Sequence, residues 1–268
     1  MGKSFETRIV NYSINSLFLK RKVRVDFYWP PGGIDINEIR LLLINDGQDL
    51  LTMNFDTILN SLYAEKQILP LLCVGIHCGG DRKDEYGTIG VLNDKGQGSK
   101  AKSYSRFILE ELIPFISEEY SITSFKEKSF CGFSLGGLSA LDIVWDHAKE
   151  FSKVGVFSGS LWWRTLSQDD PEFTEEKHRI MHNKVRNGNY YPWLKFFFEA
   201  GTQDETSDRN NNGIIDSIDD TLSLIDELVQ KGYDRTTDIH YMEIRNGKHD
   251  VTTWGRAFPD FLKWGWGK

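Results

Sequence analysis

The chain of 268 residues has few cysteines and no long apolar run. Its three cysteines, Cys73, Cys78 and Cys131, lie mostly in apolar, strand-like stretches. This odd number predicts buried thiols and argues against a disulfide framework. No stretch is long and apolar enough to cross a bilayer, and residues 1–10 contain no signal-peptide core. The visible sequence therefore favours a cytoplasmic protein that does not enter membranes, or a secreted or periplasmic one if a signal peptide has been removed.

Basic residues are also fewer than acidic ones. Lysine and arginine total 32 against 39 aspartates and glutamates, which gives a net charge of −7. Nucleic-acid binding depends on basic patches that neutralise phosphates, and none is visible, so we expect no nucleic-acid partner. The charged fraction of 26% and the hydrophobic fraction of 40% are typical of a soluble globular protein. The length suits one α/β domain over residues 1–268, and it leaves the oligomeric state open.

Strand and helix patterns alternate along most of the chain. Two alternating segments, 7–14 and 23–29, predict antiparallel strands at the N-terminal edge of a sheet. Buried strands are predicted at 39–44, 68–76, 130–133, 154–157, 196–198 and 239–244, and helices near 51–63, 104–116, 138–145, 221–230 and at the C-terminal end. Residues 81–100 form a predicted long loop. This order predicts a mostly parallel sheet with helices on both faces and a ligand site at the carboxyl ends of its strands.

Ser134 stands between two glycines in the pattern Gly132-Phe133-Ser134-Leu135-Gly136. The apolar run before it predicts a strand, and the spacing of apolar residues after it predicts a helix. A serine on such a strand-to-helix turn presents its hydroxyl at the sheet edge, which is the geometry of a nucleophile elbow. The sequence therefore predicts that Ser134 is a catalytic nucleophile. The simpler interpretation is a glycine-rich turn that carries an exposed serine.

A serine nucleophile needs a base and an acid that orients the base. In α/β-hydrolases the acid and then the histidine follow the serine along the chain. Of six histidines, His249 directly follows the last predicted strand and is the best candidate for the base. Asp204 follows the preceding strand and is the candidate acid, while Glu205 and Asp208 in the same loop are alternatives.

The reaction also requires two backbone amides that stabilise an oxyanion. One is expected from Leu135, directly after the nucleophile and at the start of a helix. The second normally comes from the turn after an earlier strand. That turn is Asp46-Gly47-Gln48, so we expect the amide of Gln48 to complete the oxyanion hole.

The segment 207–220, SDRNNNGIIDSIDD, resembles a calcium-binding loop of the EF-hand type. Such a loop presents oxygen ligands at fixed positions around a glycine at position 6, which is Gly213 here. The predicted ligands are Asp208, Asn210, Asn212, Ile214 through its carbonyl, Asp216 and Asp219. The usual final glutamate is replaced by Asp219. The pattern predicts a structural Ca²⁺, and its alternative is a polar turn before a helix.

Taken together, these motifs resemble those of the putative esterase family of α/β-hydrolases, which includes formylglutathione hydrolase, feruloyl esterase, enterochelin esterase and mycolyltransferase types. The matching stretches are 46–49, Arg82 with 85–87, 107–120, 132–137, 158–163, 201–205, and 247–249 with Trp254. The resemblance implies an α/β-hydrolase fold with Ser134, Asp204 and His249 as the catalytic triad. It also implies a substrate cleft near Arg82, Glu85, Trp162 and Trp163. The chain departs from enterochelin esterases in length, so we expect it to lack their separate N-terminal domain.

The expected function is therefore hydrolysis of a small acyl or aryl ester, including esters of carbohydrates, by a serine esterase that forms an acyl-enzyme. No cofactor is expected for catalysis. An acyltransferase of the same fold and a non-catalytic carbohydrate-binding relative are the alternatives.

Overall fold

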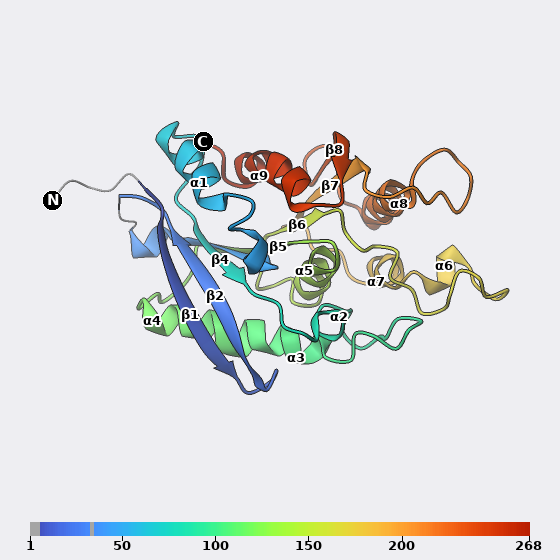
Figure 1. The fold of residues 1–268 in the computed structure, drawn as a ribbon, viewed down its shortest axis with the longest axis horizontal. Helices are drawn as coiled ribbons and strands as arrows, with labels where there is room; N and C mark the ends of the chain where they lie inside the picture. Colours follow the sequence, from blue (N-terminus) through green and yellow to red (C-terminus); the bar gives the residue numbers. More distant parts are fainter. Residues whose placement is uncertain (1–5, 33–34) are drawn as a thin grey trace.

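An eight-stranded mixed sheet runs through the computed structural model, which describes residues 6–32 and 35–268 (Figure 1). The strands are β1 (Arg8–Ser16), β2 (Arg21–Trp29), β3 (Arg40–Asn45), β4 (Leu72–Ile76), β5 (Glu127–Phe133), β6 (Lys153–Phe157), β7 (Lys195–Gln203) and β8 (Ile239–Lys248). Their spatial order is β1-β2-β4-β3-β5-β6-β7-β8.

The sheet is antiparallel at its N-terminal edge and parallel elsewhere. β1 pairs with β2 and β2 with β4 in antiparallel fashion, whereas each pairing from β4 to β8 is parallel. The carboxyl ends of β3, β5, β6, β7 and β8 therefore lie along one edge of the sheet. These findings confirm the predicted α/β-hydrolase arrangement.

Helices cover both faces of the sheet (Figure 1). α1 (Phe55–Ala64) and α9 (Val251–Trp266) pack on one face, where their aromatic and aliphatic side chains join those of the strands in one core. The other face carries α3 (Ala101–Arg106), η3 (Phe107–Leu112), α4 (Ile113–Glu119), α5 (Leu135–Asp146), α7 (Ile180–Asn187) and α8 (Asp216–Lys231). The short elements are η1 (Ile36–Glu38), η2 (Gly47–Asp49), α2 (Arg82–Glu85) and α6 (Glu175–His178).

The predicted helix near 104–116 contains a π-helical segment just before Pro114. α3, η3 and α4 follow one another directly, and η3 is a π-helix in which the amide of Ile113 donates to the carbonyl of Ile108, five residues earlier. Proline has no amide hydrogen and its ring would crowd the carbonyl four residues before it. The wider π turn places Pro114 in the first turn of α4, where the missing hydrogen costs little.

Several element boundaries also differ from the predicted ones. α1 begins at Phe55, after Asn54 in the left-handed region, and Leu51, which the pattern placed in the helix, is 83% exposed. β4 begins at Leu72, four residues later than predicted. Among the described residues that the pattern placed in the strand before it, Ile68 forms an isolated bridge to Gly267. α8 begins at Asp216, five residues before the start at residue 221 that the apolar pattern predicted.

The three cysteines are free thiols, as predicted, and Cys73 and Cys131 are buried. None of the helices in residues 6–32 and 35–268 combines the length and the apolar character that crossing a bilayer requires.

Candidate active site

Ser134 occupies a strained turn between β5 and α5. Its φ of 54° and ψ of −123° are rare for a residue with a side chain, and its hydroxyl is partly exposed. A Cβ on Gly132 would lie 2.4 Å from the carbonyl oxygen of Gly136, so only glycine lets the strand and the helix approach so closely. The turn has the sharpness expected of a nucleophile elbow.

The Ser134 hydroxyl lies beside the loop that follows β6. Its Oγ is 3.4 Å from the Oγ of Ser160, and the backbone amide of Ser160 donates to the Ser134 carbonyl. The amide of Ser134 donates to the carbonyl of Phe157 at the end of β6. These bonds fix the backbone of the elbow against the neighbouring strand.

Trp254 connects the elbow to His249. Its ring stacks on Phe133, the residue before Ser134, with ring centroids 5.0 Å apart. The same ring meets His249 edge to face at 5.4 Å. Trp254 lies in the first turn of α9, so the loop between β8 and this helix carries His249 toward the carboxyl end of β5.

Asp204 and His249 interact electrostatically. Partial desolvation lowers the pKa of His249 from its usual 6.5, while the Asp204 charge opposes that shift. Burial raises the pKa of Asp204, and His249 acts in the opposite direction. Both carboxylate oxygens of Asp204 are buried and lack a hydrogen-bond partner. No hydrogen bond between the described residues joins Ser134, His249 and Asp204, and the catalytic triad stays a prediction.

The alternative acids face elsewhere. Glu205 interacts with the acidic residues of α8 and with the amide of Ser217. Asp208 accepts hydrogen bonds from the amides of Asn212 and Gly213 within its own loop. Of these three acids, Asp204 is the one that interacts with His249.

The predicted oxyanion hole has two free backbone amides. Neither the amide of Leu135 nor that of Gln48 donates a hydrogen bond to any atom of the described residues. The Asn45 side chain donates to the carbonyl of Gly136 at 2.8 Å, which joins the end of β3 to the start of α5. The Gln48 side chain is occupied, because it donates to Asp46 and accepts from the amide of Cys78.

Of the four predicted substrate-contacting residues, two reach the surface. Arg82 is partly exposed, donates to both carboxylate oxygens of Asp46, and lies 3.5 Å from the Phe133 carbonyl. Trp162 is half-buried. Glu85 is 1% exposed and receives two hydrogen bonds from Arg21, and Trp163 is buried in the core. The sequence could not reveal that Glu85 and Trp163 are buried, and substrate contact by the four residues stays a prediction.

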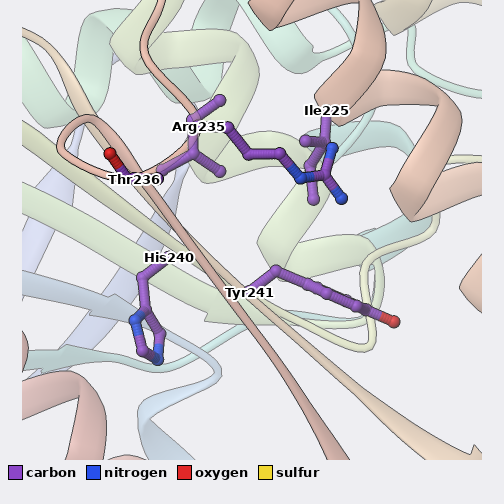
Figure 2. Close-up of a pocket in the computed structure, with 6 residues that line it drawn as sticks. Ile225, Arg235, Thr236, His240 and Tyr241 are labelled. Carbon is purple, nitrogen blue, oxygen red and sulfur yellow. The ribbon is translucent and has the colours of Figure 1, made fainter.

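A pocket away from Ser134 lies at the edge strand β8 (Figure 2). It has a volume of about 330 Å³ and is lined by Ile225, Arg235, Thr236, Ile239, His240 and Tyr241. Figure 2 shows His240 and Tyr241 projecting to opposite sides of the strand. The pocket contains none of the predicted catalytic residues, and Arg235 already forms an ion pair with Asp226.

The predicted calcium loop folds around its own side chains. The side-chain amides of Asn210 and Asn212 both donate to the carboxylate of Asp219, and Gly213 has the positive φ of 83° that the motif requires. Asp216 instead pairs with Arg209. Within residues 6–32 and 35–268, no three histidine, cysteine, aspartate or glutamate side chains form a group that could hold a metal. Calcium binding stays a prediction.

A comparison with known protein families gives one match that covers most of the chain. The family described as "Putative esterase" matches residues 16–264. The chain belongs to this putative esterase family. Membership supports an ester-hydrolysing enzyme, in agreement with the resemblance drawn from the sequence motifs.

Solved structures similar to this putative esterase share its fold at low sequence identity. Enterochelin esterase from Shigella flexneri has a TM-score of 0.71 and 20% identity over 98% of this chain, which spans 59% of that protein. The BES protein from Bacillus cereus has a TM-score of 0.71 and 18% identity, and the match covers 98% of this chain and 95% of that protein. A ferulic acid esterase has a TM-score of 0.66 and 15% identity, and the match covers 97% of this chain and 98% of that protein.

Proposed function

We propose that this chain is a serine esterase that hydrolyses a small acyl or aryl ester through an acyl-enzyme. The observation that carries the proposal is the position of Ser134, on a strained turn whose neighbour Phe133 stacks on the same tryptophan that contacts His249. Asp204 supports it, because its buried, unpartnered carboxylate interacts with that histidine.

The lowered pKa of His249 favours the neutral imidazole, which is the form that accepts a proton. His249 takes the hydroxyl proton of Ser134 as Oγ attacks the ester carbonyl carbon. The amides of Leu135 and Gln48 hold the resulting oxyanion. Collapse of this intermediate breaks the ester bond, and the leaving alcohol receives the proton from His249. Water then attacks the acyl-enzyme by the same route and releases the acid. The mechanism requires no cofactor.

The half-buried Trp162 and the partly exposed Arg82 favour an ester with an aromatic or polyhydroxyl group. One structural neighbour is a ferulic acid esterase, which makes aryl esters the first compounds to screen, followed by acetylated sugars. Acyl transfer to an alcohol shares the first half-reaction, so added alcohols would measure it in the same assay.

The first test is burst kinetics with p-nitrophenyl acetate, with mass spectrometry of the acyl adduct. We expect a burst and an adduct in the wild type, and loss of both in Ser134→Ala. Ser105→Ala is a matched control, because Ser105 is a buried serine that lies 3.1 Å from the Nε2 of His147 outside the elbow. Equal rates in wild type and Ser134→Ala would reject the proposal and favour a non-catalytic carbohydrate-binding protein.

A further inference from the structure

Glu199 is a fully buried acid for which the mechanism above has no use. It lies in β7 with 0% exposure, and neither of its carboxyl oxygens has a hydrogen-bond partner. A buried ionised carboxylate without a partner costs several kcal/mol, so such a group either finds a cation or keeps its proton. The sequence gives one signal, since this residue is the single acid within the apolar strand 196–200.

The side chain of Glu199 projects toward that of Asp204. Glu199 and Gly201 are two residues apart in β7, so both point to the same face of the sheet. A Cβ on Gly201 would lie 2.5 Å from Oδ1 of Asp204, which shows that the Asp204 carboxylate folds back over this face. The two carboxyl groups interact electrostatically.

Ser158 lies against both carboxyl groups. The indole nitrogen of Trp254 donates a hydrogen bond to the Ser158 Oγ at 3.0 Å. Because the indole is only a donor, the serine oxygen must accept, and its single hydroxyl hydrogen is left for one of the two carboxyl groups. One hydrogen cannot satisfy both acids.

The charged and titratable groups around Glu199 do not neutralise it. Asp204 is a like charge in the following turn, Tyr241 is a neutral phenol on β8, and Arg256 on α9 is exposed and interacts weakly. Burial, followed by the charge of Asp204, raises the pKa of Glu199 to about 8. Two adjacent buried carboxyl groups cannot both ionise readily, so one proton stays with the pair.

We propose that Glu199 is a positioning residue, which keeps its proton in the working enzyme and donates a hydrogen bond to the Ser158 hydroxyl, whose own hydrogen is then directed to Asp204. This inference rests on the proposed serine esterase function. The hydrogen bonds through Ser158 hold the Asp204 carboxylate in place, and Asp204 stays the one ionised acid of the pair. Ionisation of Glu199 at alkaline pH draws the Ser158 hydrogen toward Glu199, adds repulsion between the two carboxylates and displaces Asp204.

The test compares pH profiles of kcat/KM for p-nitrophenyl acetate from about pH 5 to about pH 10. In the wild type we expect a roughly tenfold fall between about pH 8 and about pH 9. Glu199→Gln carries a permanent donor, so it should keep the rate at pH 7 within about threefold and lose this fall. Glu199→Leu has no donor and should lose about tenfold at pH 7.

Asp142→Asn is the matched control. Asp142 is also fully buried, and burial raises its pKa to about 6, but it pairs with Lys184 on the outer side of α5. This variant should keep the alkaline fall of the wild type. A purely structural role for Glu199 would lower thermal stability in Glu199→Gln and leave the profile unchanged.

The proposal is overturned if Glu199→Gln shows the same alkaline fall as the wild type, or if the wild type shows none. Activity that survives in Ser134→Ala would reject the serine esterase function itself. A loss in Ser134→Ala with an unchanged profile in Glu199→Gln would reject only the positioning role. Infrared spectra of both proteins add a readout independent of turnover, because the wild type should show a protonated carboxyl band at pH 7 that Glu199→Gln lacks.

Discussion

Two groups of buried acids surround the elbow, and they differ in how their charge is balanced. In the loops before β5, each acid has an arginine: Asp46 pairs with Arg82, and Glu85 pairs with Arg21, in both cases through two hydrogen bonds. Such planar pairs satisfy both carboxylate oxygens and fix the loops that carry them.

In the segments after β6, the described residues place no arginine or lysine in an ion pair with Glu199 or Asp204, and the two carboxyl groups share the hydroxyl of Ser158. The difference indicates that an acid paired with an arginine holds its loop in place, whereas an acid without a cation remains able to take up or release a proton. The positive partner available to Asp204 is His249, whose charge appears only when it accepts the serine proton. Four predictions test this contrast, from the largest expected effect to the smallest.

Asp204→Asn removes the unpaired carboxylate behind His249. We expect a loss of about 10⁴-fold in kcat, because the amide favours the wrong tautomer of the imidazole. The measurement is steady-state turnover of p-nitrophenyl acetate. Glu205→Gln should retain activity within about threefold, since Glu205 faces α8. A larger loss in Glu205→Gln than in Asp204→Asn would assign the catalytic acid to Glu205.

Arg21→Ala leaves Glu85 buried without its cation. Breaking one side of a buried ion pair costs about 3 kcal/mol, so we expect a clear loss of the free energy of unfolding in urea. The double change Arg21→Met with Glu85→Leu should recover most of that loss, because no charge remains buried. If the double variant is as unstable as the single one, the packing of Arg21 matters more than its charge.

The titration of His249 measures how strongly Asp204 acts on it. Removing a nearby negative charge disfavours the imidazolium, so Asp204→Asn should lower the pKa of His249 below its wild-type value. NMR of the imidazole protons as a function of pH gives this value without turnover. The wild-type midpoint is expected below 6.5. An unchanged or higher midpoint in Asp204→Asn would show that the two groups do not interact.

The predicted calcium loop is a third acidic group, in which the cation would be a metal. A weak site with Kd of about 10⁻⁴ to 10⁻³ M stabilises the protein by about 1 kcal/mol at millimolar Ca²⁺, or roughly 3 °C in Tm. We expect this rise in the wild type and none in the double variant Asp208→Ala, Asp219→Ala. Chelation should leave turnover unchanged. Equal melting curves with and without Ca²⁺ would favour the polar turn.

The parts of this molecule that sequence predicted well depend on local patterns. The antiparallel strands at the N-terminal edge, the parallel strands after them and the helices on both faces follow from periodicity and turn placement. The burial of Glu85 and Trp163 depends on which side chains meet in the fold. Arg21, the partner of Glu85, lies 64 residues away in sequence, so no local pattern could reveal that the acid is paired. The environment of Glu199 was missed in part for the same reason, since Ser158 lies 41 residues before it in the sequence.

The position of β5 in the middle of the sheet has a consequence for how the protein opens. β5 is hydrogen-bonded to β3 on one side and β6 on the other, whereas β1 and β8 are edge strands. Amides in β5 should therefore exchange with deuterium only through global unfolding, while those of the edge strands exchange through local fraying. A spectroscopic label attached to Ser134, directly after β5, should therefore keep its ordered surroundings until the whole sheet separates, so it would report complete unfolding.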